Sequence, residues 1–438
     1  MENTQIELLF DRVSGKKVSA DFSGGTTTSD AGSLLLSRMD RRLGLSARIS
    51  STIKDTRTQA YVEHHVETML RQRIYQIACG YEDANDCDTL RIDPGFKTAC
   101  GSAPISGQNL ASQPTMSRLE NMATEVDVDN MRDALLDIFI AQYPKAPRSI
   151  ILDADDTCDP TYGAQQQSVF NAYYDEYCFQ PIIVFEGNTG RFVTAILRPG
   201  KRPTGEEIAG FLKPMIEKLK KVWPKTRIIL RGDSHYCSPD VLTMCHKTGI
   251  QYILGLSVNS VVKKYPPMEL LESQYAETKK DILWLGTVQY AAGSWECAER
   301  TIVKATVTAL GSDVRAIVTN LPWSKKAEKC WKFYCQRGNM ENRIKDLKSH
   351  LDSGRTSCTK FIANQFRLLV HCSAYVLMHA IREKSFAGTD FVKAQFDTLR
   401  IRFLKIGAKV TEMATKIHFA LPTSYPLADV FQRAVLQT

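Results

Sequence analysis

The chain has 438 residues, of which 43% are hydrophobic and 24% are charged, so it is long enough for two or three domains and apolar enough to bury ordinary cores. The formal net charge of +8 suits a polyanionic partner, because clustered Lys and Arg gain affinity by releasing counterions from phosphates, although many proteins without such a partner are equally basic. No run of 18 apolar residues and no signal-peptide pattern occurs, which excludes a membrane-spanning protein and predicts a cytoplasmic one with no membrane partner.

The 12 cysteines are scattered along the chain. None forms a Cys-x-x-Cys pair, and a chain of this size is too large to be a disulfide scaffold. We therefore expect reduced, mostly structural thiols rather than a zinc site.

Residues 1–145 are predicted to be helical throughout. Asp30 is the expected cap of a first helix that ends at Gly44. A second helix has one apolar stripe and ends at Gly80, and a third is expected over residues 131–143. The region contains no internal repeat.

The polar side of the second helix carries Arg71 and Arg73. Two interpretations remain open for these side chains. They can contact DNA, or they can lie on an ordinary solvated helix face, which is the commoner situation.

From Arg148 the pattern changes to strands. The segment RSIILDAD is a short apolar run that ends in acids, as expected for a buried strand that reaches the edge of a sheet. After an irregular stretch, two strands are predicted on either side of the turn at residues 187–190. A helix follows over residues 206–222, in which Pro214 must cause a kink or a break.

The segment TRIILRGD repeats the first theme, an apolar strand that ends in Asp233. Ser238 is the expected cap of the next helix, Gly249 closes it, and IQYILGLS is another strand. The predicted order is strand, strand, strand, helix, strand, helix, strand. Acids lie at the ends of the first and fourth strands.

Residues 258–322 have a β pattern again and separate these strands from the helices that should follow, so we interpret them as an insertion. A long helix is expected to begin near Lys332. A strongly apolar helix over residues 361–382 should pack under the sheet, and the basic residues 386–438 are predicted to be helical.

Three acids along this pattern suit metal-dependent chemistry on phosphodiesters, which needs two divalent metals about 4 Å apart. Magnesium prefers oxygen ligands, so two or three carboxylates must converge on a rigid frame. Asp155 and Asp233 meet this demand if their strands are neighbours, and the segment YCQRGNMENRIKDLK supplies Glu341 from a helix. Taken singly, each has a plainer explanation, because an Asp after a strand is usually a cap and a Glu four residues before a Lys is a common surface pair.

Within that helix, residues at steps of three or four share one face, so the Glu is surrounded by cations and a tyrosine that can hold phosphates. The residues of this face are Tyr334, Arg337, Glu341, Lys345 and Lys348. Four of them match the Tyr-x2-Arg-x3-Glu-x6-Lys signature of the bacterial transposase superfamily founded on insertion sequence four. The chain most resembles its insertion sequence thirteen-eighty family, through IACGYEDAND, ASQPTMSRLEN, RIILRGDS and ANQFRLL.

This resemblance spans nearly the whole chain and implies an α/β fold with a ribonuclease-H-like catalytic core. The core would comprise residues 146–257 and 323–385, interrupted by the β-rich insertion 258–322. A helical domain over residues 1–145 would bind the DNA ends, and residues 386–438 would form a helical C-terminal region.

The resemblance also implies that Asp155, Asp233 and Glu341 are the catalytic metal ligands. The superfamily places its first carboxylate two residues before a threonine, which selects Asp155 and leaves Asp153 as the alternative. Relatives commonly have Gly and an aromatic residue after Gly-Asp-Ser, where this chain has His235 and then Tyr. We expect this histidine to make a local polar contact rather than to bind metal.

Phosphates of the transposon end would be held by the remaining signature-face residues, which are Tyr334, Arg337, Lys345 and Lys348. In related enzymes an inserted β-domain supplies a tryptophan that stacks on a flipped base. Three tryptophans are available for this here, although a core position is the default for each: Trp284, Trp295 and Trp323.

The function implied is DNA transposition with Mg²⁺ as cofactor and Mn²⁺ as a substitute. The partners are double-stranded DNA, namely terminal inverted repeats and target DNA, and a second copy of the chain in a homodimeric DNA complex associated with the bacterial nucleoid. Two alternatives remain open: a DNA-binding protein derived from a transposase and no longer catalytic, and a ribonuclease-H-like nuclease that performs no strand transfer.

Overall fold

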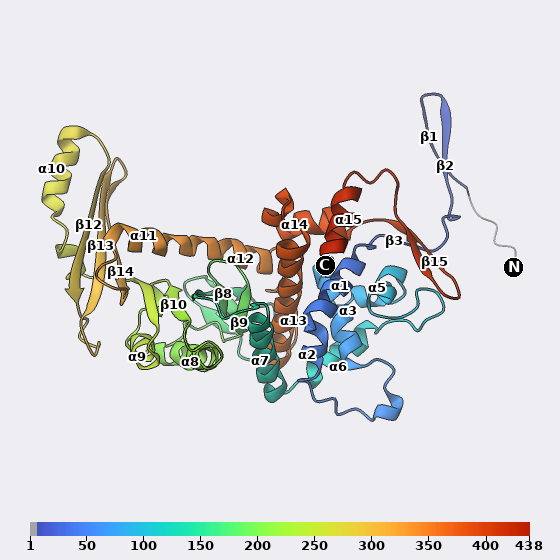
Figure 1. Ribbon diagram of the computed structural model, residues 1–438, viewed down its shortest axis with the longest axis horizontal. Helices are drawn as coiled ribbons and strands as arrows, with labels where there is room; N and C mark the ends of the chain where they lie inside the picture. The colour runs from blue at the N-terminus through green and yellow to red at the C-terminus, as the bar shows by residue number, and fades with distance from the viewer. Residues whose placement is uncertain (1–6) are drawn as a thin grey trace. The chain divides into compact units, whose positions relative to one another are not determined.

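The computed structural model describes residues 7–438, which form two compact units (Figure 1). The sheet unit comprises residues 132–349 and 353–369 and contains every candidate catalytic residue. The end unit comprises the described residues up to Met131 together with 350–352 and 370–438. Among the described residues, no helix combines the length and the apolar character needed to cross a bilayer.

The sheet unit is built on eight strands in the order β12-β13-β14-β11-β10-β4-β8-β9. β4 lies antiparallel to β8, and β8 lies antiparallel to β9, whereas β10 runs parallel to both β4 and β11. The strands of this central part are β4 (Ser149–Asp156), β8 (Ile182–Glu186), β9 (Phe192–Ile196), β10 (Arg227–Gly232) and β11 (Gln251–Leu256). The expected alternation of strands and helices from Arg148 is therefore confirmed.

Local signals set the helices between these strands. α8 (Gly205–Val222) begins in a capping box between Thr204 and Glu207, and Pro214 lies inside it without ending it. α9 (Pro239–Thr248) has the expected Ser238 cap and ends at Gly249 in the left-handed conformation. Figure 1 shows α8 and α9 side by side along the sheet.

The two faces of the sheet are covered separately, because side chains alternate along each strand. Ile228 and Leu230 of β10 pack in one apolar cluster with α8 and α9. Ile229, between them, packs in another with Cys330 and Trp331 of α11 (Ala327–Cys335). The sheet is thus buried on both faces.

The predicted insertion extends the same sheet, since β14 pairs antiparallel with β11. Its strands are β12 (Ile282–Tyr290), β13 (Glu299–Thr308) and β14 (Gly311–Thr319). The β interpretation of residues 258–322 missed one helix, α10 (Met268–Thr278), whose amphipathic sequence MELLESQYAET signals it. The irregular stretch after β4 also holds a small sheet of β5 (Asp159–Pro160), β6 (Val169–Asn171) and β7 (Glu176–Phe179).

The signature helix begins earlier than predicted and is not uniform. It starts at Ala327 rather than near Lys332, and a 3₁₀ turn over Gln336–Gly338 separates α11 from α12 (Asn339–Lys348). Figure 1 shows the two helices end to end as one rod. The expected apolar helix is present as α13 (Phe361–Ala380).

The end unit is mainly helical, but the expectation of an all-helical N-terminal region is wrong. The described chain opens with a hairpin of β1 (Leu8–Val13) and β2 (Lys16–Ala20), turned by Ser14 and Gly15, both at positive φ. β3 (Thr27–Thr28) follows. The helices are α1 (Ser33–Leu43), α2 (Leu45–Ser50), α3 (Val66–Ala78), α4 (Asp86–Leu90), α5 (Pro94–Ala99), α6 (Gln113–Met122) and α7 (Glu125–Ala141), the last of which continues into the sheet unit.

The C-terminal region is only partly helical, which corrects the second helical expectation. β15 (Ala408–Glu412) pairs with β16 (Ile417–Ala420) and with β3. The helices here are α14 (Phe396–Leu399), α15 (Ala428–Gln437) and the π-helical turns Ile381–Ser385 and Arg400–Leu404.

Two polar side chains of the end unit, Asp30 and Arg73, also differ from expectation. Asp30 does not cap α1; its carboxylate lies 2.7 Å from the Lys405 ammonium. Arg71 of α3 pairs with Asp40, and Arg73 is buried and donates to the carbonyl oxygen of Tyr81. Neither a DNA contact nor a solvated helix face describes Arg73, because backbone carbonyls of the following loop need its donors.

Candidate active site

Two acids meet at the ends of neighbouring parallel strands. In the register of β4 and β10, Arg231 lies opposite Asp153, so the positions two residues further along, Asp155 and Asp233, come next to each other. Asp233 also accepts a hydrogen bond from the His235 amide at 2.9 Å and thereby caps the turn that follows. The sequence therefore brings together two carboxylates that are 78 residues apart.

The environment of Asp155 disfavours its charge. Burial raises the pKa of the Asp155 carboxyl to about 7; the Arg337 guanidinium acts against this rise, and the Asp233 carboxylate adds to it. Arg337 Nη1 lies 2.9 Å from Asp155 Oδ2. One arginine thus compensates only part of the repulsion and desolvation at this acid pair.

The same arginine connects the acid pair to the rest of the signature face. Burial lowers the pKa of Arg337, but the nearby Asp155 carboxylate raises it above the usual range. Three further groups raise this pKa as well: Tyr334, Asp233 and Glu341. The rod of α11 and α12 therefore places three signature residues around the ends of β4 and β10.

Close packing holds Tyr334 at this position. A Cβ atom on Gly255 of β11 would lie 2.6 Å from the Tyr334 hydroxyl and 2.8 Å from the Ser234 amide nitrogen. Only glycine leaves room for the tyrosine and the turn after Asp233 to approach β11 together.

Glu341 lies one helical turn beyond Arg337, and its side chain is exposed. Over residues 7–438, the carboxylate oxygens of Asp155, Asp233 and Glu341 do not all lie within 4.8 Å of one another. The structure thus brings the two aspartates together, whereas Glu341 lies on α12, directly after the 3₁₀ turn whose Arg337 pairs with Asp155.

Lys345 and Lys348, the two lysines of this helix face, differ in their surroundings. Lys345 is exposed. The ammonium of Lys348 lies 3.0 Å from the Asp159 carboxylate, donates to Thr157 Oγ1 at 3.2 Å and donates to the Cys158 carbonyl oxygen. Lys348 therefore holds the segment that follows β4 in place.

Asp153, the alternative first carboxylate, is engaged within the protein. Its side chain is fully buried and accepts from Arg231 Nε at 2.5 Å and Nη2 at 2.8 Å, and from Arg343 Nη1 at 3.1 Å. Asp155, two residues on, instead lines a cavity. The two acids share a strand face but have different surroundings.

That cavity has a volume of about 350 Å³ and brings polar and aromatic groups to the acid pair. His235 lies in its wall, with Nδ1 3.1 Å from Asp156 and Nε2 3.3 Å from the Pro203 carbonyl oxygen, in agreement with the expected local polar contacts. Five other lining residues were not singled out from the sequence, and of these only the tyrosine pair in NAYYDEY gave a signal: Asn171, Tyr173, Tyr174, Gln180 and Arg202.

A profile of the family described as Transposase DDE domain group 1 matches residues 10–438. The chain belongs to this family. No curated protein matches its sequence. Among solved structures, the chain is similar to the cryo-EM structure of the piggyBac transposase synaptic complex with hairpin DNA, with 11% identity over 86% of this chain and 80% of that chain and a TM-score of 0.43.

The expected DDE transposase is thereby confirmed at the level of the family. The narrower assignment to the insertion sequence thirteen-eighty family stays a prediction. So do the roles of the individual residues at the site.

The transposase exposes one of its three candidate tryptophans more than the others. Trp284 and Trp295 are partly buried against the apolar cluster that includes Val262 and Tyr290. Trp323 is 57% exposed, and the Arg300 guanidinium lies 4.9 Å from its ring centre. Trp323, which directly follows the insertion, is thus the most exposed of the three rings.

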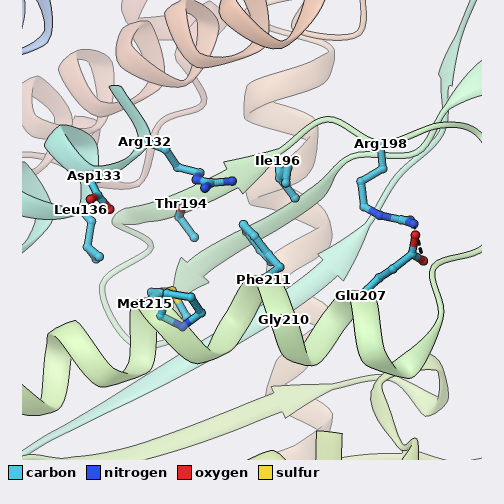
Figure 2. Close-up of a pocket in the computed structure, with 11 residues that line it drawn as sticks. Arg132, Asp133, Leu136, Thr194, Ile196, Arg198, Glu207, Gly210, Phe211 and Met215 are labelled. Carbon is cyan, nitrogen blue, oxygen red and sulfur yellow. Dashed lines mark hydrogen bonds and ion pairs between the residues drawn. The ribbon is translucent and has the colours of Figure 1, made fainter. Parts of the chain in front are cut away.

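A second cavity of the transposase, of about 380 Å³, lies between α8 and β9 (Figure 2). Figure 2 shows the Arg198 side chain reaching Glu207, with 2.7 Å between Nη2 and Oε2, and Phe211 pointing toward the strand. None of the predicted site residues is among the eleven that line it. The acid pair and this cavity are separate features.

Replacing Lys348 by Met should destabilise the transposase, because Asp159 is only 1% exposed and would lose its cation. Removing one partner of a buried pair costs about 3–5 kcal/mol, and we expect about 2 kcal/mol here since the lysine itself is partly exposed. Urea unfolding measures the change. Lys345→Met, on the same helix face, is the matched control and should alter stability by less than about 0.5 kcal/mol.

The double variant Lys348→Met with Asp159→Asn tests the cause. It should recover part of the lost stability, since the asparagine leaves no buried charge behind. Equal stability of Lys348→Met and wild type would show that the pair contributes nothing.

Proposed function

We propose that this transposase cleaves DNA at the terminal inverted repeats of an insertion sequence and transfers the 3′ ends to target DNA, with Asp155, Asp233 and Glu341 as its catalytic carboxylates. The observation that carries the proposal is the meeting of Asp155 and Asp233 at the ends of two parallel strands, where Arg337, one helical turn before Glu341, pairs with Asp155.

The strand order supports a ribonuclease-H-like core. From β9 through β8 and β4 the neighbours are antiparallel, and from β4 through β10 to β11 they are parallel. This is the arrangement typical of ribonuclease-H-like sheets. The three further strands β14, β13 and β12 then extend the edge beyond β11, between the last core strand and the signature helix.

The acid pair fits divalent cations. Hard oxygen donors are what Mg²⁺ prefers, and a cation beside Asp155 would relieve the burial and repulsion that raise the pKa of its carboxyl. Asp155 and Asp233 would hold it, and Glu341 would join them by a turn of its exposed side chain. When bound, a pair of such ions activates the attacking oxygen and stabilises the leaving oxygen.

The chain's own residues would position the DNA. Arg337 can present its planar fork of donors to a phosphate while it neutralises Asp155. Lys345 is exposed and can add a second cation. Tyr334 would hold the arginine in place. Lys348 is already paired with Asp159, and its contact with DNA stays a prediction.

Purified protein incubated with Mg²⁺ and DNA that carries the sequences flanking the gene tests the activity. We expect nicks at the element ends, followed by products in which donor 3′ ends are joined to target DNA. Hydrolysed ends without joined products would favour a simple nuclease. Binding to inverted repeats without any cleavage would favour the inactive DNA-binding protein, in which Glu341 never joins the aspartates.

A further inference from the structure

Three side chains with metal-binding atoms meet where α9 ends and β13 begins, outside the cavity at the acid pair. His246 Nε2 lies 2.6 Å from Glu299 Oε1, and Cys297 Sγ lies 3.4 Å from the same oxygen and 4.0 Å from the histidine nitrogen. The three ligand atoms therefore lie within 4.8 Å of one another. Within residues 7–438, no other three His, Cys, Asp or Glu side chains come this close together.

Backbone geometry presents the cluster. Glu299 is the first residue of β13, and Cys297 lies in the bend two residues before it, with its sulfur 3.4 Å from the Glu299 carboxylate. His246 lies in the last turn of α9, whose capped end is fixed by Gly249. The carboxylate of Glu299 is buried, whereas the imidazole and the thiol are exposed, so an ion can enter from solvent.

The donor set matches zinc better than magnesium. Imidazole nitrogen, thiolate sulfur and carboxylate oxygen are the three ligand types that Zn²⁺ accepts, whereas Mg²⁺ prefers oxygen alone. A thiolate and a carboxylate together carry two negative charges, which one Zn²⁺ neutralises. Without an ion, neutral or weakly acidic donors offset the burial of Glu299: the His246 imidazole, the Cys297 thiol and the Tyr252 hydroxyl.

The distances are close to those of a tetrahedral site. With metal–ligand bonds of about 2.0 Å to nitrogen and oxygen and about 2.3 Å to sulfur, the ligand atoms of such a site lie about 3.3–3.6 Å apart. The observed separations of 2.6, 3.4 and 4.0 Å bracket these values. Movements of less than about 1 Å, within reach of side-chain rotation, would complete the geometry.

A small cavity lies beside the three donors. Its volume is about 10 Å³, about the size of one water molecule, and its wall also includes Trp295, Glu296 and three residues of α9, Pro239, Leu242 and Thr243. A zinc site with three protein ligands keeps its fourth position for water, and this cavity provides the place for it.

We propose that His246, Cys297 and Glu299 bind a zinc ion that fastens the end of α9 to the first residues of β13. α9 follows directly on the turn that Asp233 caps, and β13 belongs to the β-rich insertion. The ion would stiffen the connection between the segment that carries a site aspartate and the insertion. This site does not depend on the proposed transposition reaction.

Cobalt is the probe that tests the proposal, because only a thiolate ligand gives a sulfur-to-Co²⁺ charge-transfer band in the near ultraviolet. Reduced, chelator-treated protein is titrated with Co²⁺ in excess Mg²⁺, which occupies oxygen-only sites. One equivalent should produce the band, Zn²⁺ should abolish it, and Cys297→Ser should lack it. His246→Ala should bind Co²⁺ at least about tenfold more weakly, because losing even an outer-shell partner of a metal site costs about that much.

Two exposed residues outside the cluster serve as matched controls. Cys335→Ser and His418→Ala should keep the full band. No band in the wild type, or a band that persists in Cys297→Ser, would overturn the proposal and leave a plain hydrogen-bonded pair of His246 and Glu299.

Thiol alkylation gives a second measurement that needs no variant. Zn²⁺ should slow modification of Cys297 by iodoacetamide at least about tenfold, since a metal-bound thiolate is a weaker nucleophile, while exposed Cys335 serves as the internal reference. Equal protection of both thiols, or of neither, would contradict a site at Cys297.

Discussion

Asp233→Asn should abolish Mg²⁺-dependent nicking of an element-end substrate. The asparagine keeps the size of the side chain but removes the charge that a divalent cation needs. Asp155→Asn and Glu341→Gln should have the same effect, and we expect each to lower the nicking rate at least about 10²–10³-fold, the loss typical of a group that stabilises the transition state. Quantified nicked product over time measures it.

Glu328→Gln is the matched control, since Glu328 is an exposed acid in the first turn of α11, on the same rod as Glu341. It should cut at the wild-type rate. All variants should bind the element end as the wild type does in a gel-shift assay, which separates chemistry from folding. Wild-type cutting by all three carboxylate variants would end the proposal.

Stability gives an independent check on Asp155. Burial and the neighbouring carboxylates raise the pKa of this group, so the folded protein disfavours its charged form. In metal-free buffer at neutral pH, Asp155→Asn should therefore unfold at a denaturant concentration no lower than the wild type. An inactive variant of undiminished stability is the pattern expected of a catalytic ligand, not of a structural one.

Local signals in the sequence were enough to predict most of the sheet unit. Ser238 and Gly249 mark both ends of α9, and the turn between β8 and β9 follows from its glycines and asparagine. These features depend on residues close together in the chain, which is why a single sequence reveals them.

The missed elements had weaker signals. The hairpin of β1 and β2 is exposed on both faces, so it lacks the apolar alternation that identifies a half-buried strand, and only the Ser14–Gly15 turn indicates it. β15 is held by its pairing with β3, which lies some 380 residues earlier in the chain. No local sequence pattern specifies such a distant partner.

The sequence singled out the candidate site residues, but it did not predict their contacts. The signature spacing singled out Arg337 and Glu341, and the strand ends singled out the two aspartates. That Arg337 pairs with Asp155, or that Lys348 pairs with Asp159, depends on strand register and helix placement. His246 and Glu299 were overlooked for the same reason. They are 53 residues apart in the chain, and only the packing of α9 against β13 brings them together.

Asp153→Asn should be among the most destabilising single changes in the sheet unit. Asp153 is fully buried between Arg231 and Arg343, and Arg231 is itself only 1% exposed. Removing the shared carboxylate leaves two guanidinium groups with no anion between them. We expect a loss of about 3–5 kcal/mol in the free energy of unfolding, the cost of an uncompensated buried charge.

Urea unfolding measures this loss, and Asp155→Asn, two residues along the same strand, is the matched control. If Asp153→Asn yields no soluble protein, Arg343→Met provides a milder test, because Arg231 would still neutralise the aspartate. We expect about 1–2 kcal/mol for that variant, below the full cost of breaking a buried pair. A change under about 0.5 kcal/mol in both would refute the argument.

Arg343 also connects stability to the site. It lies on α12 two residues after Glu341, and its guanidinium joins Asp153 at 3.1 Å and the Gly187 carbonyl oxygen at 2.5 Å. These bonds fasten the helix that carries the glutamate to the strand that carries Asp155. Arg343→Met should therefore lower the nicking rate while leaving end binding unchanged, because Glu341 would lose the support that holds it near the aspartates.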